Sequence, residues 1–104
     1  MLRAISINEV VRFTLPDDKE SPTVFLIKNI THDKKIELFS DPAKMMSNAI
    51  PTLIAGLKGI ENLDGKNYDV ITAEVLELVP FAELPKVMNA VVDFNMLGAV
   101  ETKN

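Results

Sequence analysis

The sequence contains no cysteine and no tryptophan, and His32 is its single histidine. Without cysteine the chain can form no disulfide bond, thiolate metal site or thiol nucleophile, which is in keeping with a reducing cytoplasm. A single histidine excludes histidine relays and metal sites built from several histidines. His32 stands beside Asp33 in a predicted first helical turn, and we interpret it as a surface residue.

Long apolar runs are also absent. The longest apolar stretches, at residues 50–57 and 90–92, are far shorter than the about 20 residues that span a bilayer. The first six residues carry one cation, Arg3, and no long apolar run follows them, so the plan of a signal peptide is missing. We therefore expect no contact with a membrane and a cytoplasmic location.

Clustered positive charge is missing as well. The net charge is -4, and residues 41–104 carry the excess, with five Lys or Arg against nine Asp or Glu. A phosphate backbone requires clustered cations, whereas the five lysines of this part are widely scattered. We expect no nucleic acid among the partners.

What the chain does have is the composition of an ordinary folded domain, with 104 residues of which 47% are hydrophobic and 25% charged. We predict one domain, residues 1–104, of the α+β class. An N-terminal β-hairpin at residues 5–28 packs on a C-terminal helical region of three to five helices at 31–97. A frayed tail follows at 98–104.

The hairpin prediction rests on alternation. Val11, Phe13 and Leu15 alternate with polar residues, as in a half-buried strand. The polar run 16–22, with proline at both ends, breaks this strand, and residues 23–28 then resume with β-branched and aromatic side chains.

The helices are predicted from caps and periodicity. Thr31 is a helix N-cap, with Ile36 and Phe39 on one face of the helix that follows, and Asp41 caps the next helix with Pro42 at its first position. Pro51 must kink or break that stretch. The following residues recur at spacings of three and four and predict its apolar stripe: Met45, Met46, Ala49, Ile50, Leu53, Ile54 and Leu57.

The glycine-rich segment 56–67 predicts an interior loop, with Asp64-Gly65 as a turn. After it, Thr72 caps a short helix that Pro80 ends, and Pro85 opens the last helix, which ends near Gly98. In these two helices we expect the following residues to face inward: Val75, Leu76, Val79, Val87, Met88, Val91, Val92 and Leu97.

Spacing gives no catalytic site, cofactor site or metal site. Residues 56–59 lack the span and the Lys-Ser/Thr pair of a phosphate loop, and residues 60–65 lack the first and last ligands of a calcium loop. A small metal-dependent enzyme or domain remains the alternative of another class. It would use Asp17, Asp18 and Glu20, or Glu74 with Glu77.

Binding to other proteins is the function that this pattern favours. Two long apolar helical faces and only a two-stranded sheet to cover them leave spare apolar surface, which favours a partner or self-association. Methionine suits a surface that adapts to several partners, although core packing is its more frequent role. We predict as contact residues Met45, Met46, Ile50, Met88, Val91 and Phe94.

Taken in order, several segments resemble those of the tail assembly chaperones of long-tailed bacteriophages or prophages. Residues 13–18 and 22–31 match the hairpin that leads through Ile30-Thr31 into a charged helix. Residues 56–66 and 72–80 match the glycine-containing segment and the helix after it. Many members of that family carry Gly-Trp-x-Gly in this segment, where this chain has Gly56-Leu57-Lys58-Gly59.

The resemblance implies a non-catalytic protein that holds the tape-measure or tail-tube protein during tail assembly in the bacterial host cytoplasm. The alternative function among phage proteins is that of a structural subunit, such as a tail or head-to-tail connector protein.

Overall fold

The computed structural model of the chain describes residues 1–44 and 47–97. Met45, Met46, the helix end predicted near Gly98 and the tail 98–104 lie outside this part. In chain order the strands and helices are β1 (Val10–Phe13), β2 (Val24–Lys28), α1 (His32–Phe39), η1 (Pro42–Lys44), α2 (Ala49–Gly56), β3 (Leu57–Leu63), β4 (Lys66–Tyr68), α3 (Ala73–Leu76), η2 (Phe81–Glu83) and α4 (Leu84–Leu97). The predicted α+β class and the N-terminal hairpin are confirmed.

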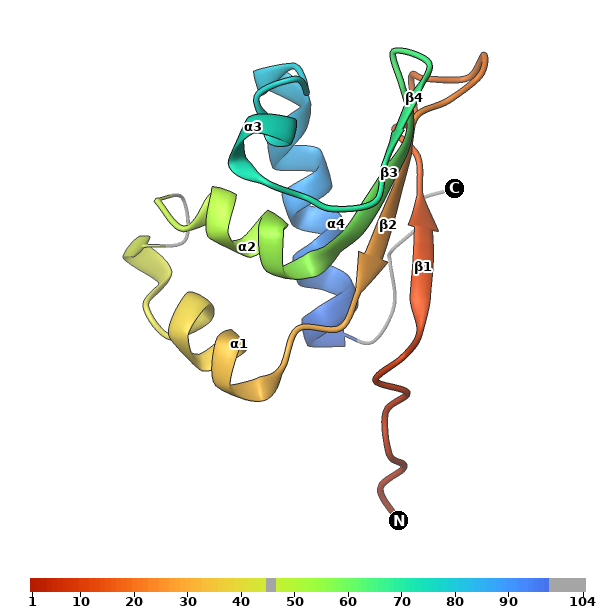
Figure 1. Cartoon of the computed structure of the whole chain (residues 1–104). Coiled ribbons are helices and arrows are strands. Elements are labelled where there is room, and N and C mark those ends of the chain that lie inside the picture. Colours follow the sequence, from red (N-terminus) through yellow and green to blue (C-terminus); the bar gives the residue numbers. More distant parts are fainter. Residues whose placement is uncertain (45–46, 98–104) are drawn as a thin grey trace.

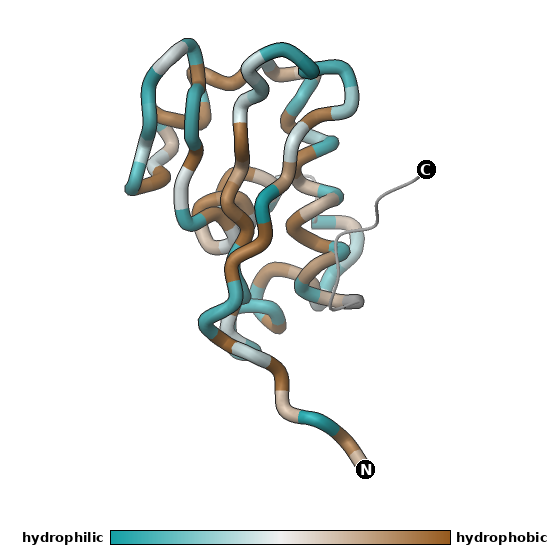
Figure 2. The backbone as a smooth tube through the Cα atoms, turned by 90° about the vertical axis from the view of Figure 1, so that its right-hand side faces the viewer, coloured by the Kyte–Doolittle hydropathy of each residue, from teal (hydrophilic) through white to brown (hydrophobic). Residues whose placement is uncertain are grey.

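The sheet is antiparallel throughout, with the strand order β1-β2-β3-β4. Helices lie on one face of it (Figure 1), so the molecule has two layers. Hydrophobic and hydrophilic residues both occur along the strands (Figure 2), and in β1 the exposed Arg12 stands between Val11 and Phe13, which pack against the core. One face of the sheet is therefore buried and the other faces solvent. On the solvent face Arg12 forms a salt bridge of 3.0 Å with Glu61 across the sheet.

The core lies between the sheet and the helices. Val11 pairs with Ile27, Phe13 pairs with Phe25, and these four side chains share the face that packs on the helices. The Phe13 and Phe25 rings are 6.4 Å apart at a tilted angle, a favourable aromatic arrangement. The predicted core face of the first strand is therefore confirmed.

Asn95, a buried polar residue of α4, fastens that helix to the link between β2 and α1. Its Oδ1 atom accepts a hydrogen bond of 2.7 Å from the Ile30 amide, and its Nδ2 atom donates to the carbonyl oxygens of Lys28 and Val91. The side chain is 7% exposed, so each of these bonds satisfies a polar group that water cannot reach. This fixes where α4 lies across the sheet.

The interior loop predicted at residues 56–67 is wrong, because the segment forms the hairpin β3–β4. Asp64 and Gly65, with φ angles of 53° and 81°, form the two-residue turn between these strands. Gly59 lies in β3, and a Cβ atom there would come within 2.7 Å of the Tyr68 carbonyl oxygen. Glycine at this position permits the close approach of two strands, whereas the prediction treated it as a sign of a loop.

The N-caps Thr31 and Thr72 are confirmed by hydrogen bonds from the amides of Lys34 and Val75. The stripe predicted from Met45 to Leu57 needs correction, because α2 begins at Ala49 and Leu57 already belongs to β3. Pro51 lies in the first turn of α2, where its missing amide hydrogen leaves no bond unmade. The predicted kink or break at Pro51 is therefore wrong, since α2 continues through the proline to Gly56.

The first helix, α1, faces the core differently from the prediction. Its buried residue is Leu38, Phe39 is half-buried, and Ile36 is 66% exposed. Among the described helices, none has both the length and the apolar character needed to cross a bilayer.

Candidate functional site

The six predicted contact residues do not form one exposed surface. Met88, Val91 and Phe94 are 8%, 0% and 4% exposed, because they lie on the face of α4 that packs against α2 and the sheet. Ile50 is half-buried against the same core. Met45 and Met46 lie outside the described residues. We correct the predicted surface accordingly, because three of its members belong to the core.

Large apolar side chains are exposed instead where α3 gives way to η2. Leu76 and Val79 point into the core there, whereas Leu78 is 56% exposed and Phe81 is 82% exposed. The predicted end of this helix at Pro80 is wrong, because α3 ends at Leu76, and Pro80, four residues farther along the chain, is exposed as well. We call Leu78, Pro80 and Phe81 the Phe81 patch.

The sequence did contain a signal for this patch. Leu76 and Val79 are the residues of this segment that face the core, so large apolar side chains at Leu78 and Phe81 must lie at the surface. Helical periodicity does not mark them, because neither residue belongs to a long apolar stripe.

A cavity of about 360 Å³ adjoins the patch. It lies between the β1–β2 connection and the chain that links α3 to α4, at the end of the molecule opposite the N-terminus (Figure 1). We call it the Asp17 pocket. Its apolar wall consists of Leu15, Phe25, Leu63, Val79 and Pro80, and its polar groups are Asp17, Asp18, Thr23 and Glu83.

Hydrogen bonds hold the outer wall of the Asp17 pocket. Asp18 accepts a bond of 2.8 Å from the Thr23 amide, and the Thr23 hydroxyl donates to the Asn62 carbonyl oxygen at 2.9 Å. The Asn62 side chain donates to the Ser21 carbonyl oxygen at 2.7 Å. The β1–β2 connection is therefore tied to the end of β3, and the pocket is preformed.

The charge at the pocket rim is negative. Glu83 is 3.4 Å from Lys86 across one helical turn, so its charge is partly balanced. Asp17 is exposed and enters no salt bridge with a described residue. An apolar floor with a free carboxylate at its edge suits an apolar group that has a cation next to it.

The residues of the metal-dependent alternative are placed as follows. Asp17, Asp18 and Glu20 lie in the β1–β2 connection, where Asp18 already accepts from the Thr23 amide. Glu74 and Glu77 are exposed on α3. In the described ranges no group of three or more His, Cys, Asp or Glu residues is arranged to hold a metal ion.

A thermal melt with added metal tests this alternative. We expect calcium, magnesium and zinc to leave the midpoint of unfolding unchanged, because a ligand raises it only by binding the folded state. Asp17→Asn in the same melts is the control for weak binding to the loop. A midpoint that climbs with metal concentration in the natural chain, and not in the variant, would establish a metal site.

Comparisons with protein-family models, with curated proteins and with solved structures give no match for this chain.

Proposed function

We propose that this chain is a non-catalytic binding protein, a tail assembly chaperone of a long-tailed bacteriophage or prophage that covers apolar segments of a tail protein. The observation that carries this proposal is the exposure of Phe81. A phenylalanine side chain gains about 1.5–3 kcal/mol when it is fully buried, and at 82% exposure almost all of that gain is still unrealised. A partner that covers the Phe81 side chain would gain this free energy on binding.

The surroundings of Phe81 favour a protein partner. Rigid aromatic side chains are common among the residues that dominate protein interfaces, and Pro80 beside it adds little flexibility. Leu78 extends the apolar area, while the exposed carboxylates of Glu74 and Glu77 keep the surface hydrated until a partner arrives. An apolar centre with a polar rim is the usual plan of an interface.

The resemblance in the sequence supplies the identity of the partner. Tail assembly chaperones hold the tape-measure protein, a long helical chain that offers repeated apolar stripes. An apolar helical stripe fits a shallow patch with an adjoining pocket, in the manner of helices that bind in hydrophobic grooves. The proposed action is stoichiometric binding in the bacterial cytoplasm, followed by displacement when the tail tube forms.

Co-expression with the proteins encoded by the flanking genes, followed by capture, tests the proposal. We expect the natural chain to retain a tape-measure or tail-tube protein and Phe81→Asp to lose at least about tenfold of it, because interface aromatics often contribute more than ~2 kcal/mol. Phe81→Asp should fold normally, since an exposed side chain is replaced.

The matched control is Ile36→Asp, which changes another exposed apolar residue on α1, far from α3 in the helical layer (Figure 1). It should capture as the natural chain does. Loss of capture in Ile36→Asp alone would move the site to α1, and failure of the natural chain to retain any tail protein would contradict the chaperone function. Persistence of the chain in finished particles would instead identify a structural subunit.

A further inference from the structure

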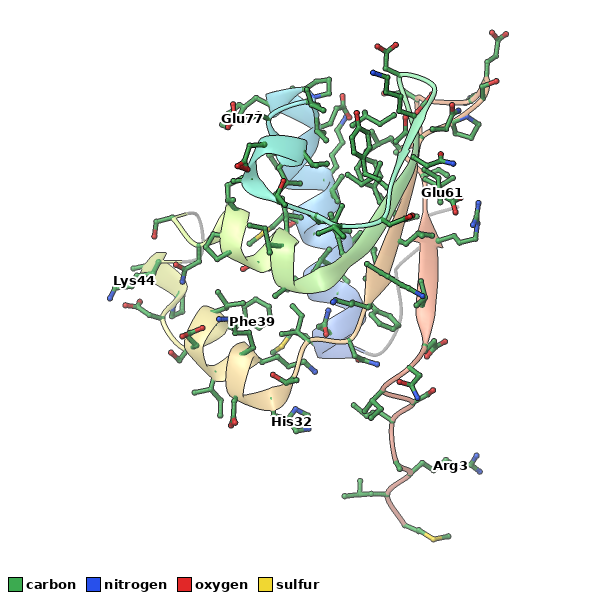
Figure 3. The ribbon with its side chains drawn as sticks, in the orientation of Figure 1. Arg3, His32, Phe39, Lys44, Glu61 and Glu77 are labelled. Carbon is green, nitrogen blue, oxygen red and sulfur yellow. The ribbon has the colours of Figure 1, made fainter. Side chains whose placement is uncertain are left out.

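The N-terminal arm, residues 1–9, carries apolar side chains that its own fold leaves uncovered. It leaves the start of β1 and extends away from the body (Figure 1), and apolar segments are visible along it (Figure 2). Leu2 is 99% exposed, Ile5 is 55% exposed, and Ile7 is 72% exposed. Between Leu2 and Ile5 stands Arg3, whose side chain points away from the body (Figure 3) and enters no salt bridge with a described residue.

One side-chain hydrogen bond fastens the arm to the body, and Ile5 and Ile7 lie beside residues 29–32. The Ser6 carbonyl oxygen accepts a hydrogen bond of 2.6 Å from the Asn29 side chain and one of 3.3 Å from the Glu9 amide. Residues 6–9 thus form a turn held against the link between β2 and α1. Residues 1–5 beyond it span at most about 18 Å, and they start at the end of the sheet opposite the Asp17 pocket.

The Asp17 pocket has the complementary chemistry. Its floor is apolar, its volume of about 360 Å³ is within the ~300–1,000 Å³ of pockets that enclose small ligands, and its rim carries the free carboxylate of Asp17. An apolar side chain flanked by an arginine satisfies the floor and the rim together. Residues 2–5 of this chain, Leu-Arg-Ala-Ile, are such a segment.

We propose that residues 2–5 of one copy bind in the Asp17 pocket of a second copy, with Leu2 or Ile5 on the apolar floor and Arg3 beside Asp17. The arm cannot reach the pocket of its own chain, because Ser6 is held at the other end of the sheet. The contact joins two different surfaces, so each copy offers a further arm and a further pocket. Association therefore continues head to tail into a closed ring or an open chain.

This inference does not depend on the proposed function, because it concerns the purified chain alone. A contact of this length buries less surface than the about 1,200 Å² of a stable interface, so we expect weak association that grows with concentration.

Sedimentation velocity at physiological ionic strength tests the proposal through a charge exchange. Arg3→Glu and Asp17→Arg should each weaken self-association about five- to tenfold, because attraction between the two residues becomes repulsion. The chain carrying both changes should regain most of the association of the natural chain, since the pair is restored with its signs exchanged. Circular dichroism should be unchanged in all three.

Glu20→Arg is the matched control, with the same change in charge in the same loop but outside the residues that line the pocket. Because Glu20 does not line the pocket, this variant should weaken association less than Asp17→Arg does. A natural chain that stays monomeric at every soluble concentration overturns the proposal.

The proposal is also overturned if Glu20→Arg and Asp17→Arg weaken self-association equally, or if the chain that carries both Arg3→Glu and Asp17→Arg does not regain self-association. Capture of a tail protein by Arg3→Glu should persist, which separates this result from the test of function.

Discussion

Val91→Asp should unfold the protein. Val91 is 0% exposed in the centre of α4, and a carboxylate placed there loses its water without gaining a partner. The effective penalty for such a buried ion is several kcal/mol, which is comparable to the about 5–15 kcal/mol by which domains of this size are stable. The far-ultraviolet circular dichroism spectrum and the urea midpoint at pH 7 measure the outcome.

Met96→Asp is the matched control for this change, because Met96 lies on the same helix and is 60% exposed. It should fold with a stability within about 0.5 kcal/mol of the natural chain, as exposed substitutions usually do. This pair separates core from surface on α4. A folded Val91→Asp that lost only partner binding would return Val91 to the interface that the sequence first indicated.

Gly56→Ala should destabilise the protein although it adds a good helix former. A Cβ atom on Gly56 would come within 2.3 Å of the Val91 Cγ1 atom and 3.3 Å of the Ile30 Cδ1 atom, where α2 crosses α4. Alanine in a helix gains up to about 1 kcal/mol over glycine, whereas overpacking a core costs about 1–3 kcal/mol. We expect a net loss of about 1–2 kcal/mol in urea unfolding, because the contact is much shorter than van der Waals distance.

Combining Gly56→Ala with Val91→Ala identifies the cause of that loss. Val91→Ala removes the Cγ1 atom that the new methyl group meets, so the two changes should be less damaging together than the sum of their separate effects. A coupling energy of at least about 0.5 kcal/mol is expected for residues in contact. Strict additivity would mean that the close approach of α2 and α4 does not limit the residue at position 56.

The sequence was sufficient for elements with strong local signals. The caps Thr31 and Thr72 each place a hydroxyl where an unpaired helix amide needs an acceptor, and the alternation from Val11 to Leu15 sets the buried face of β1. These features depend on residues within a few positions of one another. Such local features can be predicted without knowing the contacts made by distant parts of the chain.

The hairpin β3–β4 depends on distant contacts, and this is why the loop prediction failed. The Tyr68 backbone passes close to Gly59, so this position of β3 requires glycine, and the pairing of β2 with β3 shifts register between Leu26 and Ile27. That shift breaks the alternation that would have marked the strand. The Asp64-Gly65 dipeptide, a strong hairpin signal, was read as a turn without the strands on either side.

The sequence predicted the contact surface only in part, because burial of a helix face also depends on distant contacts. A helical stripe of Met88, Val91 and Phe94 predicts an apolar face but does not say whether that face meets a partner or the chain's own sheet. With four strands rather than two, the sheet covers this stripe. The exposed apolar residues are the ones left over, Leu78 and Phe81, at a point where the short helix α3 ends.

The most direct measurement of the central claim is hydrogen–deuterium exchange of the chain alone and with its captured tail protein. If the Phe81 patch binds the partner, amides of residues 77–83 should exchange at least about tenfold more slowly in the complex, while amides of β1 on the sheet edge stay unchanged. Slower exchange confined to β1 or α1, with residues 77–83 unaffected, would contradict the account.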